Sequence, residues 1–340
     1  MRTFVFIPPS AKSSGGSKVL ISMVGHLATL GFDVYAVPRE EISADSPLAR
    51  LPSVAFERLK LNPDDLWLVP EGWPNALLPG LRAGARNVIY CQNWAYLFSA
   101  LPEGVDLRQF RLSVLAVSHP TAWFISETTG LKSHILRPGI DLDRFFPPAA
   151  GARPLGSPWR VAYMPRKNKA VATGIIKAFE ARAAFGPGSQ VHFTAIEGLE
   201  QNKAAELLRR SHVFLSCGFP EGLGLPPLEA MACGCITAGS GGMGGWDYMR
   251  QAWEHPFRPW WPMRPEAETP WGGNGFWTAD ADVMAGVLAL ERALALCRNG
   301  GRAYRSVLEA GLMTAEGYSL GAWKERLAEL WRRAGAGEIF

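Results

Sequence analysis

The stretch that most constrains this chain is Ser216–Gly234, which reads SCGFPEGLGLPPLEAMACG. It follows the apolar run His212–Leu215, which we predict to be a strand, and its first half is rich in glycine and proline. From Pro227 to about Cys233 we predict a short helix, because proline suits the first helical positions and Gly234 provides a stop. A strand that ends in a glycine-rich turn before a helix is typical of phosphate-binding edges in open α/β sheets.

Short apolar runs and helical patterns alternate along the rest of the chain, which predicts parallel βαβ units. The predicted strands are 3–7, 32–37, 66–69, 87–91, 114–117 and 134–136 in the first half, and 160–164, 191–195, 213–215 and 235–238 in the second. The predicted longer helices are 17–30, 173–185, 202–210, 280–298, 302–311 and 320–333. The Pro/Gly/Ala-rich segment Phe146–Pro158 has no periodicity and indicates a domain boundary. The fold class is therefore α/β, with two parallel-sheet domains.

Composition limits the possible classes of protein. A length of 340 residues suits two domains, and 48% hydrophobic residues indicate a folded globular chain. The net charge of +4 is dispersed, which fits anionic ligands and argues against a nucleic-acid partner. The five cysteines lack C-x-x-C spacing, which favours reduced thiols. Apolar runs are too short for a transmembrane helix or a signal peptide, so we predict a cytoplasmic protein, with the inner face of the membrane as an alternative site.

Other segments after predicted strands also suit anions, although each has a plainer interpretation. The basic loop Pro165–Lys169 would suit a diphosphate, but a solvent-exposed basic loop without a ligand would have the same composition. The Ser13–Gly16 segment is a phosphate contact or an ordinary turn with a helix cap. The glycine-rich segment Gly239–Gly245 is a nest of backbone N–H groups or a flexible hinge.

The run EGLGLPPLEAMACG, from Glu221 to Gly234, resembles the E-x7-E signature of retaining glycosyltransferases with the GT-B fold, in particular glycosyltransferase family 4. The segment Arg137–Asp141, with Phe145 after it, resembles the end of the N-terminal domain in that family. The resemblance covers most of the chain. It is specific in the second half and visible in outline in the first half.

The resemblance implies a role for each part of the turn. Glu221 resembles the glutamate that holds the hydroxyls of the donor sugar, and Glu229 resembles the one that binds the nucleotide ribose. The backbone N–H groups of Gly222, Leu223 and Gly224 would bind the sugar and phosphates. The alternative is that Glu229 complements the dipole of its helix and Glu221 is solvated.

The family also has basic residues that clamp the diphosphate and a Gly-Gly loop close to it. Arg166 matches the arginine, and Lys169 matches the lysine by spacing, with Lys167 as a rival. Gly15 and Gly16 match the Gly-Gly loop and would lie near the donor phosphates and the acceptor.

This chain departs from the family at the reaction centre. Many members have a histidine after the fourth strand, whereas this chain has Gln92 and Asn93, which resemble the Gln-Asp of a rhamnosyltransferase-like subgroup. An amide cannot act as a base, but the front-face mechanism proposed for this fold lets the departing phosphate take the acceptor proton. His119 is a second candidate near the reaction centre, although a lone histidine is more often structural.

Between Trp246 and Trp277 the alternation fails, and six tryptophans lie among many prolines. Aromatic rings stack on sugars, but core packing or a membrane-facing surface would explain them equally. We interpret the segment as an insertion of unassigned purpose.

We therefore expect a GT-B enzyme with an acceptor domain at 1–150, a nucleotide-sugar domain at 151–318 and a helix at 319–340 that returns to the first domain. It would be a retaining, metal-independent hexosyltransferase without a cofactor, active in glycan or surface-polysaccharide assembly. Its partners would be a nucleoside-diphosphate sugar and a glycan, lipid-linked or small-molecule acceptor. The alternatives are a hydrolase that uses Glu221 and Glu229, a sugar phosphorylase or epimerase, and a non-catalytic sugar-nucleotide binding protein.

Overall fold

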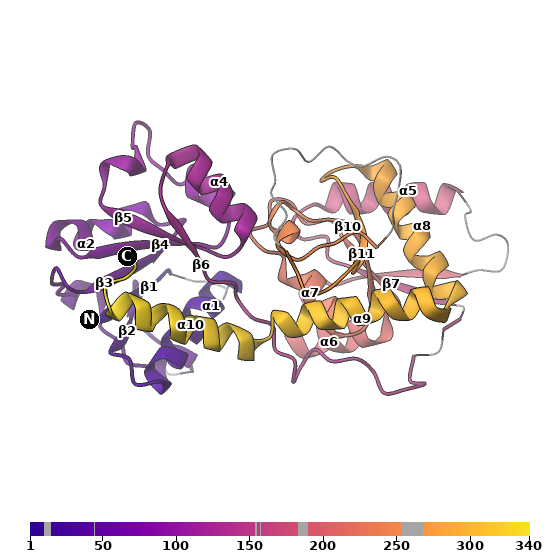
Figure 1. Cartoon of the computed structure of the whole chain (residues 1–340), viewed down its shortest axis with the longest axis horizontal. Helices are drawn as coiled ribbons and strands as arrows, with labels where there is room; N and C mark the ends of the chain where they lie inside the picture. The colour runs from indigo at the N-terminus through magenta and orange to yellow at the C-terminus, as the bar shows by residue number, and fades with distance from the viewer. Residues whose placement is uncertain (10–14, 44, 154, 157, 183–189, 253–267) are drawn as a thin grey trace. The chain divides into compact units, whose positions relative to one another are not determined.

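A computed structural model describes residues 1–9, 15–43, 45–153, 155–156, 158–182, 190–252 and 268–340. The chain divides into two compact units. Unit 1 comprises Met1–Pro138 and Trp323–Phe340, and unit 2 comprises Gly139–Ala322. Figure 1 shows the elements of both units, coloured along the chain.

Unit 1 contains a parallel sheet in the order β2-β1-β3-β4-β5-β6. Its strands are β1 (Thr3–Ile7), β2 (Val34–Pro38), β3 (Leu66–Pro70), β4 (Arg86–Cys91), β5 (Leu112–Ala116) and β6 (Ser133–Ile135). Its α-helices are α1 (Gly15–Thr29), α2 (Leu78–Ala83), α3 (Trp94–Ser99), α4 (His119–Thr129) and most of α10 (Leu320–Gly335). Short 3-10 turns are η1 (Pro47–Arg50), η2 (Phe56–Arg58), η3 (Pro74–Leu77) and η4 (Leu107–Gln109).

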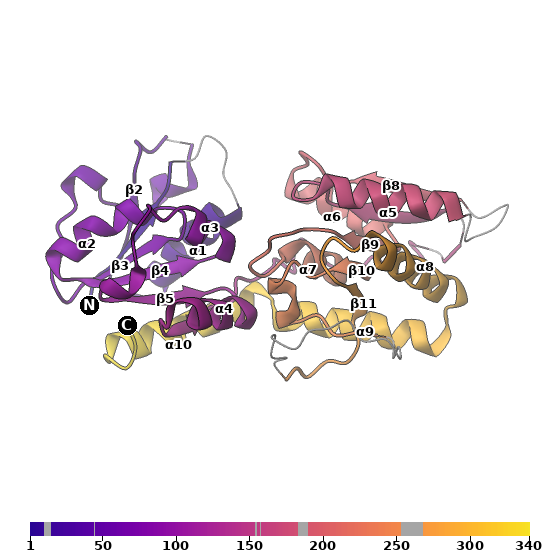
Figure 2. The same cartoon turned by 90° about the horizontal axis from the view of Figure 1, so that it is seen from above.

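Unit 2 contains a second parallel sheet, in the order β11-β10-β9-β7-β8. Its strands are β7 (Trp159–Tyr163), β8 (Val191–Ala195), β9 (Val213–Ser216), β10 (Ile236–Ser240) and β11 (Gly275–Thr278). Its α-helices are α5 (Lys169–Arg182), α6 (Gln201–Arg210), α7 (Leu225–Ala232), α8 (Val283–Asn299) and α9 (Gly301–Gly317), and η5 (Gly244–Asp247) is a 3-10 turn. The views in Figures 1 and 2 place α5 and α8 on one face of this sheet and α7 and α9 on the other.

Alternating side chains explain the core of unit 2. Val213 and Leu215 of β9 and Ile236 and Ala238 of β10 are almost completely buried on the face that α5 and α8 cover. Because successive strand residues point to opposite faces, Phe214 of β9 is buried on the other face. Burial on both faces is typical of strands in a parallel sheet with helices on each side.

The predicted α/β class and the long βαβ elements are confirmed, while shorter elements were missed. The sequence did not predict α2, α3 or α4, and β11 lies where the alternation was judged to fail. The start of α4 is explained by Ser118, whose Oγ accepts the backbone N–H of Thr121 at 3.2 Å and caps the helix. Such short helices carry little periodicity, so their caps are the stronger signal.

The units divide between Pro138 and Gly139, whereas the sequence placed the boundary at residues 150 and 151. The backbone of Ile140 explains the difference. Its N–H donates to the carbonyl of Tyr318 and its carbonyl accepts from Leu320, both at 2.8 Å. These bonds attach the residues directly after Pro138 to the chain at the start of α10, within unit 2.

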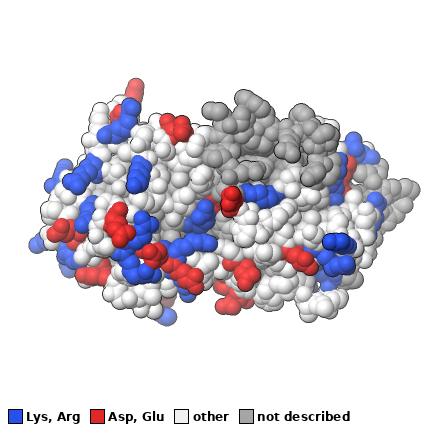
Figure 3. Space-filling model, viewed as in Figure 1, with Lys and Arg blue, Asp and Glu red and all other residues white. Residues whose placement is uncertain are grey.

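Charged side chains are mixed in sign on the face shown in Figure 3, where blue and red groups are interspersed. This agrees with the small net charge of +4. Among the described residues, no helix has both the length and the apolar character needed to cross a membrane.

Candidate functional site

The loop that carries Glu221 joins β9 to α7 at the carboxyl end of the unit 2 sheet. Gly222, Leu223 and Gly224 are buried in this loop, and Glu221 is half-buried. Gly224 adopts the left-handed conformation (φ 83°) at the N-cap of α7, which favours glycine. The loop thus brings the N-terminus of α7 to the carboxyl end of the sheet, as the sequence predicted.

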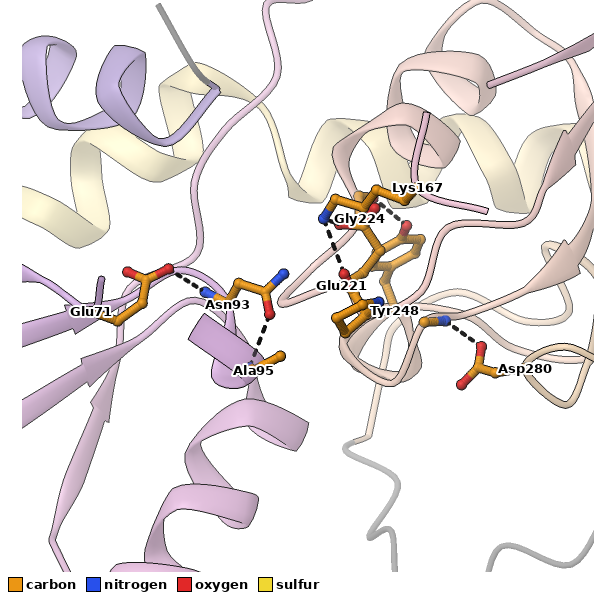
Figure 4. Close-up of polar contacts among 10 residues, drawn as sticks. Glu71, Asn93, Ala95, Lys167, Glu221, Gly224, Tyr248 and Asp280 are labelled. Atoms are coloured by element: carbon orange, nitrogen blue, oxygen red, sulfur yellow. Dashed lines mark hydrogen bonds and ion pairs between the residues drawn. The ribbon is translucent and has the colours of Figure 1, made fainter. Parts of the chain in front are cut away.

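Glu221 is bound by a lysine from the loop after β7. The Nζ of Lys167 lies 2.7 Å from Glu221 Oε2 and 3.0 Å from the carbonyl oxygen of Pro220. Both charged side chains are 21% exposed, so their attraction is screened less than at an open surface. Figure 4 shows the ammonium directed at the carboxylate.

The other predicted donor residues lie on the same loop or on the helices α5 and α7. Arg166 is exposed next to Lys167, and Lys169 is exposed as the first residue of α5. Glu229 is half-buried in the middle of α7. The geometry therefore favours Lys167 over Lys169 as the lysine beside Glu221, although the sequence spacing favoured Lys169.

The glycine-rich segment Gly239–Gly245 packs backbone to backbone against the Glu221 loop. Glu221 N–H donates to Gly242 O at 2.8 Å, and Gly244 N–H donates to Glu221 O at 3.0 Å. A Cβ on Gly244 would lie 2.0 Å from the carbonyl oxygen of Gly222. The absence of side chains thus allows two loop backbones to touch, an explanation that the sequence analysis did not consider.

Two side chains that the sequence analysis missed hold these loops in place. Asp280 Oδ1 accepts the N–H of Gly242 at 2.7 Å, and the hydroxyl of Tyr248 donates to Gly224 O at 2.6 Å (Figure 4). Tyr248 is completely buried, and burial raises the pKa of its phenol, with the nearby Tyr318 and Glu221 adding to the effect. The phenol therefore stays protonated and remains a donor to the Gly224 carbonyl.

The described ends of the Trp/Pro segment support Tyr248. Trp271 Nε1 and Asn274 Nδ2 both donate to its carbonyl oxygen, at 2.9 and 2.8 Å. This part of the segment therefore has a packing role. Trp253, Trp260 and Trp261 of the same segment lie outside the described residues.

In unit 1, the turn after β4 carries the amides predicted for the reaction centre. Gln92 Nε2 donates to the carbonyl oxygen of Gly16 at 3.2 Å, which links the turn to the start of α1. The Asn93 side chain accepts the N–H of Ala95 at 3.0 Å and caps α3. The structure thus brings Gln92, Asn93 and Gly16 together, with Gly15 next to Gly16 as the first residue of α1.

His119 and the segment Ser13–Gly16 are the remaining predicted positions in unit 1. His119 is half-buried as the first residue of α4. Ser13 and Ser14, which precede Gly15, lie outside the described residues. Glu71, directly after β3, was not predicted as a site residue, yet its carboxylate is buried and contacts the Asn93 backbone at 2.8 Å.

The cysteines are all free and buried. Burial raises the pKa of Cys217 to about 12, and it raises that of Cys235 to about 11 although the Arg153 guanidinium lowers it in part. Both thiols therefore stay protonated and unreactive near neutral pH. Among the described residues, no group of three or more His, Cys, Asp and Glu side chains is arranged to hold a metal ion.

No protein-family profile matches the chain. Over 236 residues the chain is 26% identical to an alpha-1,6-glucosyltransferase of Actinobacillus pleuropneumoniae serotype 7 (strain AP76). The matched region covers 67% of this chain and 69% of that protein.

Solved structures resemble the chain over nearly its whole length. Sucrose-phosphate synthase from Thermosynechococcus elongatus has a TM-score of 0.68 at 14% identity, covering 99% of this chain and 100% of that chain. The catalytic domain of starch synthase IV from Arabidopsis thaliana, bound to ADP and acarbose, has a TM-score of 0.64 at 14% identity, covering 98% of each chain. The chain therefore has the GT-B fold, as the sequence predicted.

Proposed function

We propose that this chain is a retaining, metal-independent glycosyltransferase that moves a hexosyl group from a nucleoside-diphosphate sugar to an acceptor hydroxyl. The observation that carries the proposal is the Glu221 loop of unit 2. A carboxylate lies there beside the Lys167 ammonium, at the N-terminus of α7 and the carboxyl end of a parallel sheet. Together these groups suit a ligand with hydroxyls at one end and a diphosphate at the other.

We assign the donor-binding roles from this arrangement. Glu221 would accept hydrogen bonds from the sugar hydroxyls, and Glu229 would bind the ribose. Arg166 and Lys167 would stabilise the departing diphosphate, with Lys169 as the alternative lysine, and the N–H groups of the Gly222–Gly224 backbone would add to this effect. Lys167 must share its charge between Glu221 and the donor once the donor is bound, because it lies 2.7 Å from the carboxylate in this structure.

The acceptor would bind to unit 1 at Gln92, Asn93, Gly15 and Gly16, with His119 as a further candidate. The bond from the anomeric carbon to the diphosphate oxygen breaks, and the acceptor oxygen bonds to that carbon on the same face. The departing diphosphate takes the acceptor proton, since neither amide can accept it. Glycan or surface-polysaccharide assembly is the proposed setting, and the similarity to a glucosyltransferase makes glucose the first sugar to test.

A thermal-shift screen of nucleoside-diphosphate sugars, with UDP-, ADP- and GDP-linked hexoses, tests donor binding. A donor at 100 times its Kd should stabilise the protein by about 2.7 kcal/mol. The stabilising donor is then incubated with candidate acceptors, with and without EDTA, and the anomeric configuration of the product is read by NMR. Glu221→Gln should lower turnover about 100-fold or more.

Other outcomes would identify another function. Free sugar from a simple glycoside would indicate a hydrolase. Transfer of the sugar to inorganic phosphate would indicate a sugar phosphorylase. Conversion of the donor to its epimer would indicate an epimerase. Tight donor binding without turnover on any acceptor would favour a binding protein, and loss of turnover in EDTA would contradict metal independence.

A further inference from the structure

Glu71 is a buried carboxylate at the carboxyl end of the unit 1 sheet, directly after β3. Its residue is 8% exposed, and Oε1 accepts the backbone N–H of Asn93, itself 4% exposed, at 2.8 Å. Figure 4 shows this carboxylate directed at the Asn93 backbone. The bond joins the ends of β3 and β4, which are neighbours in the sheet.

The turn that Glu71 holds makes two further contacts. The Asn93 side chain caps α3 through the N–H of Ala95, and Gln92 donates to the carbonyl of Gly16. Asn93 therefore uses its backbone to bind Glu71 and its side chain to start a helix. The Glu71 bond thus fixes the backbone position from which both amides, Gln92 and Asn93, extend.

Burying a carboxylate is costly, so its hydrogen bond to the turn must be well formed. Burial raises the pKa of Tyr90 and of the Cys91 thiol on the neighbouring strand, and the nearby Glu71 carboxylate raises both further. Glu71 Oε1 restrains the turn through a buried hydrogen bond, which any carbonyl oxygen at the same position could also accept.

We propose that Glu71 is a positioning residue for the acceptor side of the reaction: its carboxylate holds the Asn93 backbone, and through it the Gln92 and Asn93 amides, where the acceptor hydroxyl binds. This inference rests on the proposed function. Glu71 acts through the turn and not by contact with the substrate. The role requires a hydrogen-bond acceptor at the position of Oε1. Glutamine at this position should therefore preserve transfer activity, whereas alanine should not.

The test uses Glu71→Ala and Glu71→Gln in the full chain, with donor and acceptor kinetics measured separately. Glu71→Ala should lower kcat for transfer by about 10- to 100-fold, because small displacements of reacting groups are costly. Its donor KM and its donor-induced thermal shift should remain unchanged. Glu71→Gln should keep kcat within about threefold of wild type, because its side-chain carbonyl can accept the same N–H.

Asp65 supplies a control at the opposite end of β3 from Glu71. It lies just before β3, is 3% exposed, accepts the backbone N–H of Asn62 at 2.7 Å and pairs with the Arg2 guanidinium at 2.6 Å. Asp65→Ala should lower the melting temperature and leave kcat unchanged. If Asp65→Ala lost as much kcat as Glu71→Ala, general destabilisation would explain the loss in both variants. That result would overturn the positioning role of Glu71.

The remaining outcomes separate the two proposals. A wild-type protein without donor binding or transfer contradicts the proposed function itself. An active wild type with Glu71→Ala within threefold of it overturns the role of Glu71 alone. Should Glu71→Ala not fold, Glu71→Gln decides: kcat near wild type supports positioning through this hydrogen bond, and a loss of tenfold or more in a folded protein overturns it.

Discussion

Lys167 and Lys169 are separated by one residue and differ in environment. Lys167 bonds to Glu221 and to the Pro220 carbonyl, whereas Lys169 is exposed at the start of α5. Lys169 is the first residue of α5, whereas Lys167 belongs to the loop between β7 and α5 that contacts the Glu221 loop. Chain spacing alone cannot distinguish these positions.

This difference predicts unequal effects of two alanine substitutions. Lys167→Ala should lower kcat/KM for the donor by about 10- to 100-fold, because it removes a positive charge from the donor site. Lys169→Ala is the matched control and should stay within about threefold, since exposed charges contribute little. Steady-state kinetics on both variants tests this. The reverse order of effects would restore Lys169 as the functional lysine.

At the scale of elements, the Glu221 loop depends on its contact with the glycine-rich segment Gly239–Gly245, which leads into η5. Gly244→Ala would place a Cβ 2.0 Å from the Gly222 carbonyl oxygen, which is backbone and cannot rotate away. We expect a loss of about 1–3 kcal/mol in the free energy of unfolding. We also expect weaker donor binding, because the N–H groups of the Glu221 loop must move.

Denaturant unfolding and the donor-induced thermal shift measure these two effects. Gly272→Ala is the matched control, because Gly272 is exposed in the same unit and a Cβ there would meet no atom within 4 Å. Wild-type donor affinity in Gly244→Ala would show that the close packing of the loops does not shape the donor site.

At the scale of the whole molecule, the last helix completes unit 1. Trp331 of α10 is 0% exposed, and its Nε1 donates to Thr3 Oγ1 of β1 at 3.0 Å. Arg86 at the start of β4 donates to the carbonyl of Ala334 at 3.1 Å. Figure 1 shows this helix in yellow, in front of the strands of unit 1 in that view, and the bond to Thr3 places it against β1. The two ends of the chain are therefore part of one folding unit.

Trp331→Ala should destabilise unit 1 by about 3–5 kcal/mol, the usual cost of removing a buried tryptophan. Calorimetry should show a lower melting temperature for the unit 1 transition and little change in that of unit 2. Glu325→Ala, at an exposed position of the same helix, should leave both transitions in place. An unchanged unit 1 transition in Trp331→Ala would contradict the role of α10.

The sequence by itself determined the features that depend on neighbouring residues. Strand periodicity predicted the two parallel sheets, and the consecutive residues from Ser216 to Gly234 predicted the turn that leads into α7. A turn of this kind is specified locally, by glycine conformations and by proline at the start of a helix. The roles predicted for Glu221 and Glu229 came from the resemblance of this stretch to a family signature.

The tertiary structure decided which distant residues meet. Lys167 and Glu221 are 54 positions apart, and Glu71 and Asn93 are 22 apart. Parallel strands bring their carboxyl ends to one edge of a sheet, but the strand order selects the loops that meet there. The close contact of Gly244 with Gly222 and the return of α10 to β1 likewise depend on packing between segments far apart in the chain. Local patterns cannot specify these contacts, because their partners are chosen by the fold as a whole.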